Sequence, residues 1–137
     1  MLRPIELCIV DDERIVCERL RSVFEKNGLL VETFTDSQAA KERLAQKRFD
    51  ILITDLKMAH PDGIELLSFV RQQAPEIRVV IITGYATVET ARQAMQRGAV
   101  DFIAKPFRLG QLRDLVLKIA QEIQEIPEQS SDAPPGT

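Results

Sequence analysis

Short runs of branched apolar residues alternate along the chain with longer segments in which apolar positions recur at helical spacing. Each short run has the length and composition of a strand buried on both faces. These runs are residues 5–10, 29–34, 49–54, 78–82 and 100–104. The helical segments are 13–27, a stretch carrying Ala39, Ala40 and Leu44, and then 64–73, 88–97 and 109–126. This alternation predicts an α/β fold, a doubly wound parallel sheet of five strands with helices on both faces.

Several helix boundaries are marked by capping and stop residues. Thr35, Asp36 and Ser37 can cap the second helix, and Thr87 can cap the fourth. Asn27-Gly28 and Gly98 are stop signals at the ends of the first and fourth helices.

The composition indicates a single globular domain. The chain has 137 residues, of which 45% are hydrophobic and 28% charged, and a formal net charge of -3. The acidic balance and the lack of a tight basic cluster argue against direct nucleic-acid binding. No secretory signal is apparent, and the longest uncharged stretch, 79–88, is too short to span a bilayer. We expect a cytoplasmic domain over residues 1–126, followed over 127–137 by a flexible tail or the start of an interdomain linker.

Two residue types that often carry chemistry have simpler explanations here. Cys8 and Cys17 match no metal-ligand spacing and are interpreted as small buried apolar groups. His60 is the only histidine, and without partner ligands it is interpreted as an exposed loop side chain.

Polar side chains follow four of the five predicted strands. Asp11 and Asp12 follow the first strand, Asp55 the third, Thr83 the fourth and Lys105 the fifth. The carboxyl ends of parallel strands share one edge, which is where open α/β sheets bind their ligands. Each residue alone has an ordinary structural explanation, as a helix cap, a turn residue or a surface charge. Their recurrence at four strand ends predicts a site.

The chemistry of this predicted site favours phosphoryl transfer. Three carboxylates repel one another, and Mg²⁺ with its preference for oxygen ligands relieves that repulsion. The Lys105 ammonium and the Thr83 hydroxyl can stabilise a transferring phosphoryl group. Asp55 is left as the nucleophile that forms an aspartyl phosphate.

With these residues in place, the sequence resembles the receiver domain of two-component response regulators over residues 5–126. The resemblance implies the flavodoxin-like strand order 2-1-3-4-5. The motifs that carry it are Val10-Asp11-Asp12-Glu13, Asp55-Leu56-Lys57-Met58 with Asp62-Gly63, Ile82-Thr83-Gly84-Tyr85, and Asp101-Phe102-Ile103-Ala104-Lys105-Pro106-Phe107.

The resemblance assigns a role to each residue at the strand ends. It implies that Asp55 accepts a phosphoryl group from a histidine kinase or phosphotransfer protein. Asp12 and Asp55 would bind Mg²⁺ directly, Asp11 through water, and the Lys57 carbonyl would complete the protein ligands. Lys105 matches the phosphate-binding lysine, and its bond to the following proline is often cis in this family.

The resemblance also implies how the signal leaves the site. Thr83 and Phe102 match the switch pair, and the fourth helix, fifth strand and fifth helix form the surface expected to change and to pair two copies. Lys57 and Tyr85 would lie beside the path of the attacking water and modulate dephosphorylation. The run 83–91 is most similar to receivers of enhancer-binding transcription activators. Such a domain is not an enzyme beyond its own phosphoryl transfer and slow autodephosphorylation.

One departure and three alternatives accompany this interpretation. Many family members have a proline where this chain has Ala59, and here Pro61 comes two residues later. An aspartate-nucleophile phosphohydrolase is the main alternative, although Lys57 stands where those enzymes carry a second aspartate. A stand-alone receiver in a phosphorelay and a phosphorylation-independent interaction module are the others.

Overall fold

The computed structural model describes residues 3–126, which form five strands and five helices in strict alternation. Their bounds are β1 Glu6–Val10, α1 Arg14–Lys26, β2 Leu30–Phe34, α2 Ser37–Gln46, β3 Ile51–Asp55, α3 Gly63–Gln73, β4 Arg78–Thr83, α4 Val88–Gln96, β5 Asp101–Ala104 and α5 Leu109–Glu125.

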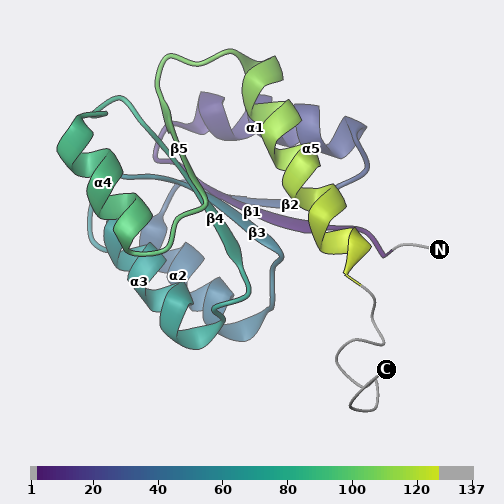
Figure 1. Cartoon of the computed structure of the whole chain (residues 1–137), viewed down its shortest axis with the longest axis horizontal. Coiled ribbons are helices and arrows are strands. Elements are labelled where there is room, and N and C mark those ends of the chain that lie inside the picture. Colours follow the sequence, from purple (N-terminus) through teal and green to yellow (C-terminus); the bar gives the residue numbers. More distant parts are fainter. Residues whose placement is uncertain (1–2, 127–137) are drawn as a thin grey trace.

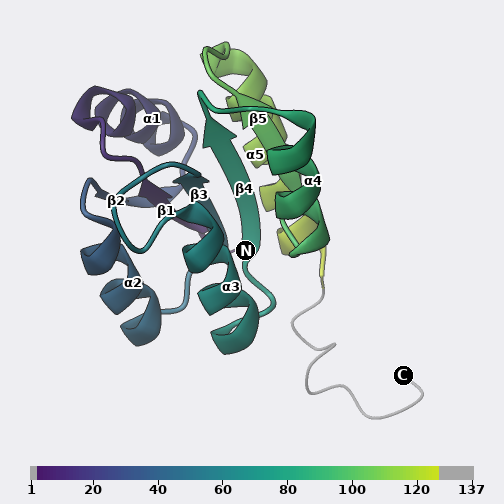
Figure 2. The ribbon, with the colours of Figure 1, turned by 90° about the vertical axis from the view of Figure 1, so that its left-hand side faces the viewer.

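The strands form one sheet in the order β2-β1-β3-β4-β5, and all four pairings are parallel. Helices α1 and α5 cover one face, and α2, α3 and α4 cover the other (Figure 1). Helix α4 lies beside β5 at the edge of the sheet (Figure 2). The predicted fold class and strand order are confirmed.

The core is divided into two apolar clusters, one on each face of the sheet. Ile51 and Ile53 belong to the cluster beneath α1 and α5, whereas Leu52 belongs to the cluster beneath α2, α3 and α4. Successive residues of a strand point to opposite faces, so continuous apolar runs supply both clusters. This double burial is the reason that the strands appear in the sequence as uninterrupted apolar runs.

Most predicted boundaries lie within one or two residues of the observed ones. The instructive differences are Asp55 and Thr83, which are the last residues of β3 and β4 and not the first residues after them. Asp55 is in register with Ile82, and Thr83 with Ala104, so the sheet itself fixes the backbone of both residues.

The helix caps largely follow the prediction. Asp36 caps α2 by accepting from the Gln38 N–H, and Thr87 caps α4 by accepting from the Thr90 N–H. Gly28 and Gly98 follow the ends of α1 and α4 with φ of 86° and 104°, a conformation that glycine adopts without strain.

Two expectations concern the limits of the chain. The predicted tail or linker, 127–137, lies outside the described residues. None of the helices formed by residues 3–126 has the length and apolar character needed to cross a bilayer.

Candidate functional site

The structure brings Asp11, Asp55 and Lys105 into contact, although they come from three different strand ends. The Lys105 Nζ lies 2.7 Å from Asp11 Oδ2 and 2.9 Å from Asp55 Oδ2. Asp11 is fully buried and Asp55 is 6% exposed. The convergence expected from the topology is therefore present, with one ammonium bridging two buried carboxylates.

Burial and hydrogen bonding shift the pKa values of Asp11 and Lys105. Burial raises the pKa of Asp11, and hydrogen bonds from Lys105 and from the Glu13 N–H act in the opposite direction without cancelling it. Burial alone would lower the pKa of Lys105, but hydrogen bonds to Asp11 and Asp55 outweigh burial and raise that pKa. Lys105 is therefore charged at neutral pH and offsets the repulsion between the two carboxylates.

Asp12 adds a third carboxylate to this edge of the sheet. Asp11, Asp12 and Asp55 each offer an oxygen, and these oxygens all lie within 4.8 Å of one another. Two oxygens bound to one Mg²⁺ lie at most about 4.2 Å apart, because Mg–O distances are about 2.1 Å. The donor set fits Mg²⁺ if one carboxylate acts through water or the set contracts slightly. Asp12 is exposed, which leaves its oxygens accessible to an entering ion.

The backbone after Asp55 holds the other side of its carboxylate. The Lys57 N–H donates to Asp55 Oδ1 at 3.2 Å, and Lys105 occupies Oδ2. Thr83, fully buried at the end of the neighbouring strand, accepts from the Tyr85 N–H through Oγ1 at 3.1 Å. The Thr83 hydroxyl is thus engaged with the loop that follows β4.

The side chains of Lys57 and Tyr85 meet above this edge. The Lys57 Nζ lies 5.5 Å from the centroid of the Tyr85 ring, within the range of a cation–π interaction. Tyr85 is 62% exposed. This cation–π contact joins the loop after β3 to the loop after β4 on the solvent-exposed side of the site.

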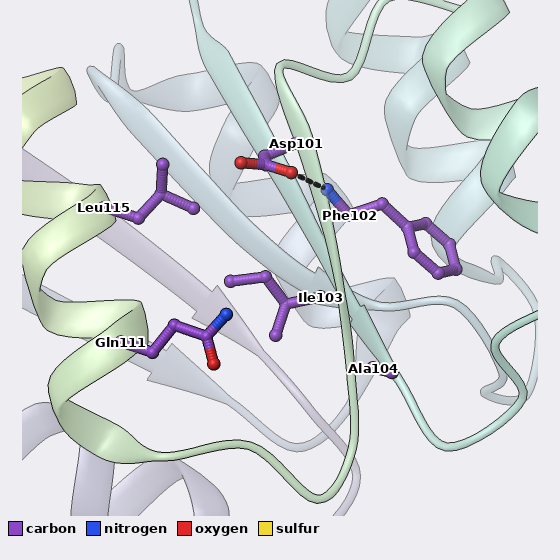
Figure 3. A pocket seen from close by; sticks show the side chains of 6 residues that line it. All are labelled: Asp101, Phe102, Ile103, Ala104, Gln111 and Leu115. Atoms are coloured by element: carbon purple, nitrogen blue, oxygen red, sulfur yellow. Dashed lines mark hydrogen bonds between the residues drawn. The ribbon is translucent and has the colours of Figure 1, made fainter.

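Phe102 lies on β5 with its ring directed away from α5 (Figure 3). The ring is half-buried and packs against the cluster beneath α2, α3 and α4. Its neighbour Ile103 points to the opposite side, toward Gln111 and Leu115 of α5 (Figure 3). The Phe102 N–H donates to Asp101 Oδ1 at 2.7 Å.

Two residues of the site, Glu13 and Gly63, belong to the motifs that carry the family resemblance but were assigned no role of their own. Glu13 Oε1 lies 3.2 Å from Lys105 Nζ, and the Glu13 N–H donates to Asp11 Oδ1 at 2.8 Å. Gly63, the first residue of α3, packs so closely that a Cβ there would lie 2.2 Å from the Asp55 carbonyl oxygen. The acidic run 11–13 and the Asp62-Gly63 pair were visible as patterns, but neither pattern reports a contact with a distant residue.

The loop between β3 and α3, where Ala59 departs from the family pattern, is well anchored. Ser37 Oγ donates to the Ala59 carbonyl at 3.0 Å, and the Gly63 N–H donates to the Leu56 carbonyl at 3.0 Å. The bond from His60 to Pro61 is cis, as is the bond from Lys105 to Pro106. His60 is exposed, as expected, and its Nδ1 lies 2.7 Å from Glu65 Oε1.

A family model described as the response regulator receiver domain matches residues 7–117. The chain belongs to this family. The resemblance seen in the sequence is therefore confirmed, and the family is one of signalling switches. This membership favours a switch over the phosphohydrolase alternative.

Full-length relatives of this receiver domain are several times longer than the chain. It is 37% identical over 108 residues to the response regulator protein PilR of Pseudomonas aeruginosa, covering 79% of this chain and 24% of PilR. It is 33% identical over 129 residues to the nitrogen assimilation regulatory protein NtrX of Azorhizobium caulinodans, covering 88% of this chain and 28% of NtrX. The chain thus spans about a quarter of the length of these curated relatives.

Solved receiver domains have the same fold. The receiver domain of NtrX from Brucella abortus superposes with a TM-score of 0.77 at 29% identity, over 84% of this chain and 98% of that one. The beryllofluoride-activated NtrC4 receiver domain, solved as a dimer, gives a TM-score of 0.80 at 26% identity, over 85% and 97% of the two chains.

Proposed function

We propose that this receiver domain is a switch whose Asp55 accepts a phosphoryl group from a sensor histidine kinase or phosphotransfer protein. In this step an Asp55 oxygen forms a bond to phosphorus as the phosphorus–nitrogen bond of the donor's phosphohistidine breaks. The imidazole nitrogen keeps the electron pair of the broken bond. In dephosphorylation, water attacks the phosphorus and releases inorganic phosphate and the free Asp55 carboxylate.

The arrangement that supports this proposal is the Lys105 ammonium between two buried carboxylates. Its Nζ lies 2.7 Å from Asp11 and 2.9 Å from Asp55, so a cation is already placed where negative charge would accumulate during transfer. Preorganised charge of this kind is the main means of stabilising a transferring phosphoryl group. Lys105 would exchange its contact with the Asp55 carboxylate for one with phosphoryl oxygens.

Asp11, Asp12 and Asp55, with the Lys57 carbonyl, would hold Mg²⁺. The carboxylate oxygens within 4.8 Å of one another supply hard ligands. Bound there, Mg²⁺ would neutralise charge on the phosphoryl oxygens. Thr83, the last residue of the neighbouring strand β4, would donate its hydroxyl to one of those oxygens.

Phosphorylation would change the surface formed by α4, β5 and α5. It adds roughly −1.5 to −2 of charge at one edge of the sheet, and Thr83 and Phe102 would couple that charge to repacking near α4. The readout would be an output domain, a partner or a second copy of this chain. The similar protein AlgB of Pseudomonas aeruginosa, 38% identical over 107 residues, is named a transcriptional regulatory protein, which supports control of transcription, with DNA contacted by another domain.

Lys57 and Tyr85 would set the lifetime of the phosphorylated form. Their side chains meet at 5.5 Å on the solvent side of the site, where an attacking water would approach Asp55. Bulk at this position hinders water and slows hydrolysis.

Incubation with a small phosphodonor and Mg²⁺ tests the proposal. Intact-mass analysis should show one added phosphoryl group, and Asp55→Asn should abolish it. Asp36→Asn is the matched control, because Asp36 caps α2 and asparagine caps helices equally well. Labelling that persists in Asp55→Asn would show that another residue is the acceptor.

A further inference from the structure

Thr83 is joined to the loop after β4 by a single side-chain hydrogen bond. Its Oγ1 accepts from the Tyr85 N–H at 3.1 Å. Thr83 is fully buried, while residues 84–87 are all exposed. A rotation of the Thr83 hydroxyl toward Asp55 would therefore remove the acceptor of the Tyr85 N–H and release the start of this loop.

The other end of the loop is tied by the hydroxyl of Thr90 in the first turn of α4. Thr90 Oγ1 accepts from the Thr87 N–H at 2.9 Å. It also lies 3.0 Å from the Thr87 hydroxyl oxygen, 3.1 Å from the Thr87 carbonyl and 3.2 Å from the Tyr85 carbonyl, any of which it can donate to. A hydroxyl has only one proton to donate. Thr90 therefore has three alternative acceptors at closely similar distances, two on Thr87 and one on Tyr85, and only the last holds Tyr85.

Few buried side chains hold helix α4 against the rest of the domain, so the acceptor to which Thr90 donates can affect the position of the helix. Ala94 is its only buried residue, while Val88 is 76% and Met95 is 46% exposed. Little apolar burial fixes the helix, so the reciprocal Thr87 and Thr90 cap contributes much of what orients its first turn.

The geometry points to Thr90 as the positioning residue that transmits the movement of Thr83 into α4. Tyr85 is the link, because its N–H binds Thr83 and its carbonyl binds Thr90. When Thr83 turns away, Tyr85 moves and the Thr90 hydroxyl donates instead to the carbonyl or hydroxyl oxygen of Thr87, which reorients the first turn of α4. This inference rests on the proposed function, which supplies the reason for Thr83 to move.

Methionine methyl signals allow the site and the helix to be observed separately in the full chain. Met58 lies in the loop after Asp55, and Met95 lies on α4. With [¹³C-methyl]methionine labelling, Mg²⁺ and beryllofluoride as the phosphoryl mimic should shift both signals in the unsubstituted protein. In Thr90→Val the Met58 shift should be retained and the Met95 shift largely lost, because one hydroxyl bond changes a two-state equilibrium about fivefold.

Two control variants separate transmission from simple destabilisation of α4. Thr90→Ser keeps the hydroxyl and should restore the Met95 shift. Thr87→Val removes the capping hydroxyl but leaves the contact between Thr90 and the Tyr85 carbonyl, so the Met95 shift should persist. A full Met95 shift in Thr90→Val, or equal losses in Thr90→Val and Thr87→Val, would overturn the inference. Absence of any Met58 shift in the unsubstituted protein would instead refute the proposed function.

Discussion

Replacing Gly63 with alanine tests how strictly the backbone position of Asp55 limits phosphoryl transfer. The new Cβ would lie 2.2 Å from the Asp55 carbonyl oxygen and 2.7 Å from Leu56 Cα. Both neighbours are backbone atoms, so no side-chain rotation relieves the contact. To reach even 3.0 Å from the carbonyl oxygen, α3 and the end of β3 must separate by about 0.8 Å.

The expected effects follow from that displacement. Overpacking against backbone costs about 1–3 kcal/mol of the free energy of unfolding. A misplacement of about 1 Å at a reacting group can slow a reaction about 100-fold. We therefore expect Gly63→Ala to lower the urea midpoint and to slow phosphorylation by a small phosphodonor about 10- to 100-fold, measured by intact mass over time.

Gly84→Ala is the matched control, because nothing lies within 4 Å of a Cβ built at Gly84. It adds the same methyl group beside Thr83, and its stability should change by less than about 0.5 kcal/mol. If Gly63→Ala is destabilised but phosphorylates within about twofold of Gly84→Ala, the position of Asp55 does not limit the reaction.

Two further predictions concern the solvent side of the site and the opposite end of the sheet. Lys57→Ala and Tyr85→Ala should each change the decay rate of the phosphorylated form. Because the contact between the two side chains is worth about 0.5–1 kcal/mol, the decay rate of the double variant should differ about 2- to 5-fold from the product of the two single effects. A double-variant rate equal to that product would rule out a shared role. The pKa of Asp50 is lowered, because hydrogen bonds from Arg3 and the Glu6 N–H outweigh burial. Its contribution to stability is therefore present above about pH 4 and lost as pH falls through the lowered pKa. Asp50→Asn should lower the free energy of unfolding by about 1 kcal/mol at pH 7. In urea unfolding, this difference between the variant and the unsubstituted protein should shrink toward about pH 3. A difference that does not change with pH would refute the role given to the Asp50 carboxylate.

The fold could be predicted because both faces of the sheet are covered. Continuous apolar runs such as 78–82 identify strands, and most connections from Pro61 onward carry a glycine or proline, as at Gly98 and Pro106. The ends of β3 and β4 were placed one residue early, since Asp55 and Thr83 are polar and a pattern of apolar residues stops before them. Their membership in the sheet depends on pairing with Ile82 and Ala104, which no local pattern reports.

The candidate site was predictable to the extent that strand ends determine it. Asp11, Asp55 and Lys105 could be brought together by topology alone. Glu13 was not, because it is the N-cap residue of α1, beyond the end of β1, and its place in the sequence indicates only the start of a helix and not its contact with Lys105. The Thr87 and Thr90 pair has the spacing of a capping box, so the cap was detectable, but the bond from Thr90 to Tyr85 depends on the path of the loop.

The division of the core into two clusters has a consequence for how such a domain can diversify. The sheet separates the side chains beneath α1 and α5 from those beneath α2, α3 and α4, and Phe102 contributes to the second group only. Substitutions on the α1 side thus leave the packing around Phe102 intact. The protein can therefore acquire a partner on the α1 face without a change in the side chains that pack against Phe102.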